Sequence, residues 1–182
     1  TLRKLGSHLQ GHPDMRKTPG VDANTGSLGQ GIAIAMGMAL AAKHAKKDYR
    51  VFTLVGDGEC QEGLVWEAAM SAAHYKLDNF TVIMDHNRLQ IDGDNDDVMS
   101  LGDIMGKFAA FGFDTYKVDG HDIDAVTAAL KAPFTPGRPK FVCCETVKGK
   151  GVSFMENKAS WHGSTIKQAD YEAAIKELKE AL

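Results

Sequence analysis

Two short apolar runs of the sequence are each followed by residues that carry oxygen ligands for a cation. Asp57 stands between Gly56 and Gly58 just after the first run, and Asn87 follows the second run. A carboxylate, an amide oxygen and a nearby backbone carbonyl are hard ligands that Mg²⁺ prefers, and phosphate oxygens and water fill its remaining positions. The two glycines would let a diphosphate approach the backbone closely. We therefore expect a site for Mg²⁺ and a diphosphate.

These residues meet only if the segments before them are neighbouring strands. Apolar β-rich runs alternate with helical segments along the chain, which indicates an α/β fold with a parallel sheet flanked by helices. In such sheets ligands bind beyond the carboxyl ends of the strands, and a following helix adds N–H donors. We predict strands over Arg50–Val55, Phe80–Asp85, Gly112–Val118 and Lys140–Val147, and helices over Leu28–Lys47 (with Ser27 as N-cap), Glu62–Tyr75, Asp103–Phe111, Asp122–Lys131 and Asp170–Leu182.

The first predicted helix is unusual in holding three glycines, Gly29, Gly31 and Gly37. Each costs about 1 kcal/mol relative to alanine inside a helix. We therefore expect this helix to pack closely against another backbone or a ligand.

Composition excludes several classes of protein. The chain has 182 residues, 21 Lys and Arg against 24 Asp and Glu, and a formal net charge of -3, which argues against nucleic-acid binding. Its longest mostly apolar stretch, Leu28–Ala42, is too short and too interrupted to span a membrane. The three cysteines, Cys60, Cys143 and Cys144, form neither a disulfide framework nor a zinc knuckle, so the cytoplasm is the expected compartment.

A series of short motifs, from about Ser7 to Gly163, makes the sequence resemble the thiamine-diphosphate-binding (PP) domain of transketolase. More narrowly, it resembles the N-terminal subunit of bacterial and archaeal transketolases that are split into two polypeptides. The motifs are Gly11-His12-Pro13, Thr18-Pro19-Gly20-Val21, Thr25-Gly26-Ser27-Leu28-Gly29-Gln30-Gly31, Gly56-Asp57-Gly58-Glu59, Glu62-Gly63, Trp66-Glu67-Ala68, Leu89-Gln90-Ile91-Asp92-Gly93, Asp119-Gly120-His121-Asp122, Thr146-Val147-Lys148-Gly149-Lys150-Gly151 and Trp161-His162-Gly163.

The resemblance implies the metal ligands and the catalytic residues. Asp57, Asn87 and the carbonyl of Leu89 would hold Mg²⁺, for which Ca²⁺ or Mn²⁺ can substitute. His12 would face the sugar substrate, and His162 would reach the diphosphate and the reacting centre, so that both serve as catalytic residues.

The resemblance also implies a cofactor-binding set. Thiamine diphosphate would be lined by Gly26, Ser27, Leu28, Gly56, Gly58, Glu59, Asn87 and His162. Where full-length relatives commonly have Gly-Pro-Leu-Gly, this chain has Gly26-Ser27-Leu28-Gly29, a change that the backbone role should tolerate. Glu62 and Glu67 match acidic positions that link the two active sites across the family's subunit interface.

The resemblance further implies that the chain is half of an active site. We expect one PP-type domain over residues 1–182 that lacks its N-terminal portion. The glutamate that activates the cofactor belongs to a Pyr domain, which would come from a C-terminal transketolase subunit. By analogy, two copies of each chain would form a heterotetramer that acts on sugar phosphates, with C₂ symmetry as the usual arrangement.

Transfer of a two-carbon ketol unit between sugar phosphates is the leading function, and two alternatives stay open. Another thiamine diphosphate enzyme, a deoxyxylulose-phosphate synthase or a 2-oxo acid dehydrogenase E1 component, would keep the cofactor and change the reaction. A non-catalytic interaction module derived from a transketolase would explain the short N-terminus, although His12 and His162 argue against it.

Overall fold

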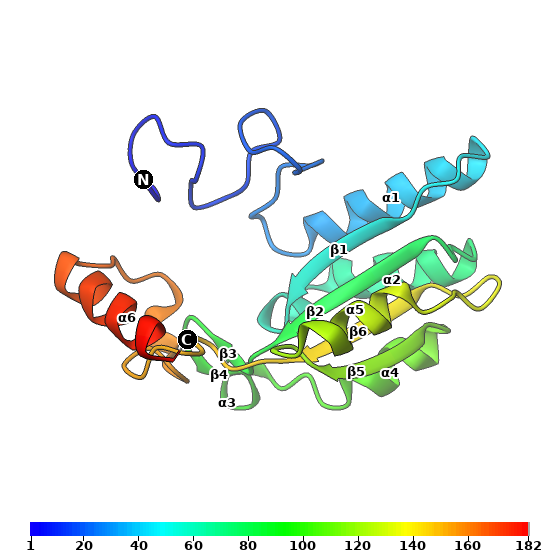
Figure 1. Cartoon of the computed structure of the whole chain (residues 1–182). Helices are drawn as coiled ribbons and strands as arrows, with labels where there is room; N and C mark the ends of the chain where they lie inside the picture. Colours follow the sequence, from blue (N-terminus) through cyan, green and yellow to red (C-terminus); the bar gives the residue numbers. More distant parts are fainter. Residues whose placement is uncertain (182) are drawn as a thin grey trace.

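A four-stranded parallel sheet forms the centre of the computed structural model, which describes residues 1–181. The strands lie in the order β1 (Val51–Gly56), β2 (Phe80–His86), β6 (Lys140–Glu145) and β5 (Asp114–Asp119) (Figure 1). Each neighbouring pair is parallel. The predicted α/β fold is therefore confirmed, and β1 and β2 are neighbours as the candidate site requires.

Helices cover both faces of this sheet. Alternation along β6 sends Phe141 and Cys143 to a core shared with α1, α2 and α4, whereas Val142 and Cys144 pack beneath α5. Within residues 1–181 the helices are α1 (Gln30–His44), α2 (Gly63–His74), α3 (Asn95–Met99), α4 (Ile104–Phe111), α5 (Ile123–Lys131) and α6 (Gln168–Glu180), with short 3₁₀ turns at Gly58–Gln61 and Ala159–His162.

The carboxyl end of the sheet is where the irregular segments gather. A hairpin of β3 (Leu89–Gln90) and β4 (Gly93–Asp94) follows β2, and Figure 1 shows this hairpin and α6 beyond the strand ends. The sequence analysis missed the hairpin and α3 because elements this short carry too little periodicity to be recognised. The described helices include none that is both long and apolar enough to cross a bilayer.

The start of α1 differs from the prediction. Ser27 is not the N-cap; that position is Gly29, in the left-handed region at φ 78°, with no side-chain cap, and the helix ends at His44 rather than at Lys47. The Gly29 N–H instead donates to Oε1 of Glu59 at 2.8 Å. A carboxylate from another element thus takes the place of the local cap.

Glycines at the start of α1 are closely packed, but against side chains rather than against the expected backbone or ligand. A Cβ on Gly29 would lie 2.9 Å from the Cβ of Glu62, and one on Gly31 would lie 3.1 Å from the Thr25 side chain. Gly37 has no heavy atom within 4 Å of that position, so the prediction is wrong there.

Gly29→Ala and Gly37→Ala are expected to shift stability in opposite directions. Alanine at position 29 must adopt a left-handed backbone, which costs about 1–2 kcal/mol, and its Cβ meets Glu62. Alanine at position 37 stabilises the helix by about 0.5–1 kcal/mol because it restricts the unfolded chain. Urea denaturation measures both, and a Gly29→Ala chain as stable as the Gly37→Ala chain would contradict the packing argument.

Candidate active site

The register of β1 and β2 brings the two predicted ligand positions to one edge. Gly56, the last residue of β1, pairs with Asp85 of β2, and the Asp57 N–H donates to the Asp85 carbonyl at 3.2 Å. Asn87 follows two residues after Asp85. Asp57 and Asn87 therefore lie side by side beyond the carboxyl ends of adjacent strands.

Asp57 is a buried carboxylate held by backbone donors. Its residue is only 1% exposed. Oδ1 accepts from the N–H of Gly58 at 2.8 Å, and Oδ2 accepts from the N–H of Arg88. Arg88 itself has a left-handed backbone at φ 66°. A buried carboxylate is costly without compensation, so an adjacent cation would add to what these two donors supply.

Asn87 is also held in one orientation. Its Oδ1 accepts from the N–H of Leu89 at 3.0 Å, and its Nδ2 donates to Oδ2 of Asp85 at 3.2 Å. The oxygen and the nitrogen of the amide thus face different partners. The donor set of Asp57, Asn87 and the Leu89 carbonyl is chemically suited to Mg²⁺, and all three residues line one cavity.

That cavity has a volume of about 390 Å³ and collects most of the predicted site. From the predicted set it is lined by Leu28, Gly56, Asp57, Gly58, Glu59, Asn87, Leu89 and His162, and it also holds Gln61, Glu62, Asp85, Gln90, Ile91, Asp92 and Lys148. Gly26, Ser27 and His12 are not among its lining residues. The edge of the sheet is therefore hollowed where the sequence predicted a ligand.

The two glycines around Asp57 differ in their surroundings. A Cβ on Gly56 would meet nothing within 4 Å, so the backbone there is open to a ligand. A Cβ on Gly58 would lie 3.1 Å from the Cβ of Gln90. Gly58 therefore allows the β3–β4 hairpin to approach, in addition to whatever a ligand needs.

Glu59 connects the cavity to the start of α1. Its carboxylate accepts from the N–H of Gly29 at 2.8 Å and from the N–H of Gly56 at 3.2 Å. These bonds tie the Gly26–Gly29 segment to the end of β1. The arrangement makes Glu59 a support for that segment, a role that the sequence did not suggest.

His12 lies against Gly26 rather than in the main cavity. A Cβ on Gly26, whose φ is 136°, would approach ring atoms of His12 to 2.6 Å. His12 lines a separate hollow of about 730 Å³ with Asn24 and Thr25. The structure thus brings His12 to the segment that follows it, while His162 lines the cavity that holds Asp57.

Lys148 lines the same cavity as His162 and influences the pKa of His162. Desolvation, followed by the charge of Lys148, lowers the pKa of His162 below the ordinary histidine value. His162 is therefore neutral at pH 7 and able to accept a proton.

Glu62, the N-cap of α2, lines the same cavity without a capping hydrogen bond, and Glu67 is exposed on α2.

Lys148→Met is expected to raise the pKa of His162. The substitution removes a positive charge that disfavours the imidazolium, while the desolvation stays, so the pKa moves up but remains below the ordinary value. Protonation of His162 then sets in at a higher pH than in the native chain. An NMR titration of the His162 ring measures the shift, and an unchanged or lower midpoint would contradict this electrostatic account.

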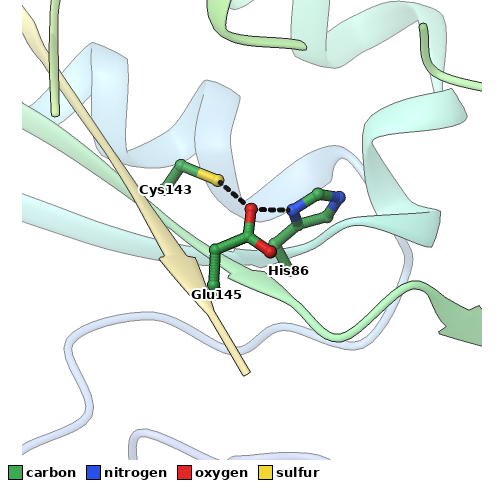
Figure 2. A group of neighbouring side chains, drawn as sticks. All are labelled: His86, Cys143 and Glu145. Atoms are coloured by element: carbon green, nitrogen blue, oxygen red, sulfur yellow. Dashed lines mark hydrogen bonds and ion pairs between the residues drawn. The ribbon is translucent and has the colours of Figure 1, made fainter. Parts of the chain in front are cut away.

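A second group of possible ligands lies on β2 and β6. His86, Cys143 and Glu145 place ligand atoms within 4.8 Å of one another, and Figure 2 shows the Glu145 carboxylate between the other two. Glu145 accepts from His86 at 2.8 Å and pairs with Arg88 at 2.7 Å and with Lys117 at 3.0 Å.

The carboxylate of this group is engaged in ion pairs. Burial, then the charge of Glu145, raises the pKa of Cys143 to about 12, so the thiol stays protonated. Burial alone would raise the pKa of Glu145, but the hydrogen bonds from His86 and Lys117 and their charges outweigh it and hold the pKa at about 2. Glu145 is thus an ionised anchor for the segment that carries Asn87.

Sequence reasoning missed the residues around the cavity that hold Asn87 in place. Asp85 accepts from Asn87 and, through Oδ1, from the hydroxyl of Thr146. Arg88 anchors the same segment through Glu145. Position was the only signal in the sequence, because Asp85, Arg88 and Thr146 each lie near the carboxyl end of a predicted strand.

The chain belongs to the transketolase family through its thiamine diphosphate binding domain, whose family description matches residues 1–182. It is 42% identical over 183 residues to a subunit of apulose-4-phosphate transketolase from Phocaeicola vulgatus, covering 100% of this chain and 65% of that protein. It is 40% identical to the 6-deoxy-6-sulfo-D-fructose transketolase subunit SqwG of Clostridium sp., over 98% of this chain and 66% of that protein. The chain therefore spans about two thirds of the length of these relatives.

Solved structures agree with this assignment. Transketolase from Campylobacter jejuni superposes with a TM-score of 0.89 at 33% sequence identity, covering 98% of this chain and 29% of that one. Transketolase from Leishmania mexicana gives a TM-score of 0.86 at 32% identity, over 98% of this chain and 28% of that one. This chain thus corresponds to less than a third of each of those two chains.

Proposed function

We propose that the chain is the thiamine-diphosphate-binding subunit of a split transketolase, which transfers a two-carbon ketol unit between sugar phosphates. The observation that carries the proposal is the donor set of Asp57, Asn87 and the Leu89 carbonyl, which line one cavity with His162 beyond the ends of adjacent parallel strands. Such a cavity is where α/β sheets bind their ligands.

Mg²⁺ would be held by Asp57, Asn87 and the carbonyl of Leu89, with Ca²⁺ or Mn²⁺ as substitutes. The cation would neutralise the diphosphate, and thiamine diphosphate would supply the electron sink that breaks the carbon–carbon bond. Gly56 leaves the backbone open to the diphosphate. Gly58 and Asn87 would contact it.

The chain's own residues would orient the reactants and move protons. His162 is neutral because its pKa is lowered, so it can accept a proton in the cavity. His12 would orient sugar hydroxyls from the neighbouring hollow. Gly26, Ser27 and Leu28 would line the cofactor, and Glu59 would hold them through Gly29.

The second half of the site would come from a C-terminal subunit with a Pyr domain, whose glutamate activates the cofactor. The names of the two relatives given above support this, because each is called a subunit of a transketolase rather than the whole enzyme. Two copies of each chain would form the assembly, with the exposed Glu62 and Glu67 at the interface between sites.

Sugar phosphates of the pentose phosphate pathway are the proposed substrates, and the cytoplasm is the proposed compartment. The relatives' names, which include a phosphorylated and a sulfonated sugar, support an anionic sugar as substrate. The three cysteines are free and buried, which suits a reducing compartment.

Thermal unfolding with and without ligands tests the proposal. Mg²⁺ with thiamine diphosphate should raise the unfolding temperature, whereas Mg²⁺ with ADP should not, because a ligand that binds only the folded state stabilises it. The same titration with a Pyr-domain subunit, followed by a ketol-transfer assay, tests the split site. Absence of thiamine diphosphate binding both with and without that subunit would overturn the proposed function.

A further inference from the structure

Asp85 is a carboxylate with both oxygens engaged, one residue before the last residue of β2. Its backbone pairs with Gly56 on one side and with Cys144 on the other, so the residue is fixed in the sheet. Oδ1 accepts from the Thr146 hydroxyl, and Oδ2 accepts from Nδ2 of Asn87 at 3.2 Å. The carboxylate therefore cannot rotate without breaking one of these bonds.

The amide of Asn87 has two similar ends, and its partners decide which end faces the cavity. An ionised carboxylate only accepts hydrogen bonds, so the –NH₂ end of Asn87 must face Asp85. The oxygen then lies on the opposite side, where it accepts from the Leu89 N–H at 3.0 Å and keeps a second lone pair. Only the oxygen end of an amide can ligate a cation.

Thr146 contributes to this orientation without lining the cavity that holds Asp57. It follows β6, and its N–H donates to the His86 carbonyl at 3.2 Å. It lines the neighbouring hollow of about 710 Å³ that contains His121 and Glu145. Asn87 also lines this hollow, and the Thr146 hydroxyl is linked to the Asn87 amide by hydrogen bonds through Asp85.

We propose that Asp85 and Thr146 are positioning residues that turn the Asn87 amide so that its oxygen faces the cation. The inference rests on the proposed function, because it needs a cation held by Asp57, Asn87 and Leu89. Neither residue needs to touch that cation. Partners that orient a metal ligand in this way contribute about 10–100-fold to metal affinity.

Asp85→Asn is the decisive variant because it keeps the size of the side chain and adds a donor. The new –NH₂ group can face the Asn87 oxygen, so the amide can turn its own –NH₂ toward the cation. We expect the Mg²⁺ concentration for half-maximal thiamine diphosphate binding to rise about 10–100-fold. Thr146→Val removes the hydroxyl at constant shape and should also raise this Mg²⁺ concentration. Thr146→Ser retains the hydroxyl and should keep the Mg²⁺ concentration at its native value.

The measurement is made on the chain in complex with its Pyr-domain subunit. Thiamine diphosphate binding is titrated by calorimetry at a series of Mg²⁺ concentrations, and Mn²⁺ binding is followed by electron paramagnetic resonance, so that neither readout depends on activity. Excess Mg²⁺ should return the Asp85→Asn complex to native thiamine diphosphate affinity. The unfolding temperature without ligands reports separately on the fold.

Each outcome decides the inference. A raised Mg²⁺ requirement in Asp85→Asn and Thr146→Val, corrected in Thr146→Ser, supports it. If the native complex binds thiamine diphosphate and Asp57→Ala does not, while Asp85→Asn requires no more Mg²⁺ than the native complex, only the inference fails. A loss of affinity that excess Mg²⁺ does not correct, or a loss that follows the ligand-free unfolding temperature, assigns a structural role and also overturns it. If the native complex binds no thiamine diphosphate, the proposed function fails as well.

Discussion

Asp57→Ala is expected to abolish stabilisation by Mg²⁺ and thiamine diphosphate. At a ligand concentration of about 100 times Kd, the native chain should gain about 2.7 kcal/mol, and the variant should gain nothing. The reason is that Asp57 is the one predicted cation ligand with a full negative charge, and it is only 1% exposed. Differential scanning fluorimetry with and without the two ligands measures the gain directly.

The ligand-free stability of the variant must be measured separately. Alanine also leaves the N–H groups of Gly58 and Arg88 without their acceptor, which lowers the ligand-free stability. Asp57→Asn keeps an acceptor oxygen and should fold more stably than the alanine variant, yet it lacks the charge that the cation needs. Asp97→Ala removes an exposed carboxylate outside the cavity and should keep the full ligand response. A full response in Asp57→Ala would refute the assignment of the metal site.

The meeting of Asp57 and Asn87 could be predicted because it follows from topology. Two successive strands in a parallel sheet end at the same edge, so residues just beyond them converge once the strands are neighbours. The pairing of Gly56 with Asp85 meets that condition. No side-chain contact was needed, which is why the apolar runs, together with the oxygen-bearing residues that follow them, were enough to predict the place of the site.

The residues that support the site could not be predicted, because their partners are remote in sequence. Glu59 accepts from Gly29, thirty positions away, and Thr146 donates to Asp85, 61 positions away. The left-handed backbone of Arg88 is likewise set by tertiary contacts, since nothing in a local pattern favours φ 66° for an arginine. The prediction of Ser27 as the N-cap was wrong for the same reason. Local propensity favours Ser27 there, but the acceptor at the start of α1 is Glu59, which is remote in sequence.

These supports share a common arrangement. The predicted ligands lie at the ends of β1 and β2, and two of the residues that hold them, Arg88 and Asp85, are bonded in turn to Glu145 and Thr146 at the end of β6. Glu145 fixes the Arg88 side chain, and the Arg88 backbone donates to Asp57. The central position of β6 therefore places Glu145 and Thr146 where they hold the segment that carries the predicted cation ligands.

Phe108→Ala is expected to be the most destabilising single change in the core, at about 3–5 kcal/mol. The ring is fully buried and stacks on Phe141 at a centroid distance of 3.9 Å. It also packs edge-on to Phe113 at 5.2 Å and against Trp66 at 5.3 Å. One side chain of α4 thus joins α2 and β6, and urea denaturation should show a lower midpoint with an unchanged slope.

Phe52→Ala supplies the matched comparison for Phe108→Ala. Phe52 is 44% exposed on the edge strand β1, where its ring lies beneath the Arg50 guanidinium at 5.4 Å. Its loss should cost less than about 1 kcal/mol, the size of an exposed cation–π contact. Phe108→Leu keeps an apolar side chain and should recover part of the loss in Phe108→Ala, because the residual cavity is smaller. Equal losses in Phe108→Ala and Phe52→Ala would mean that the aromatic cluster does not hold α2 and α4 to β6.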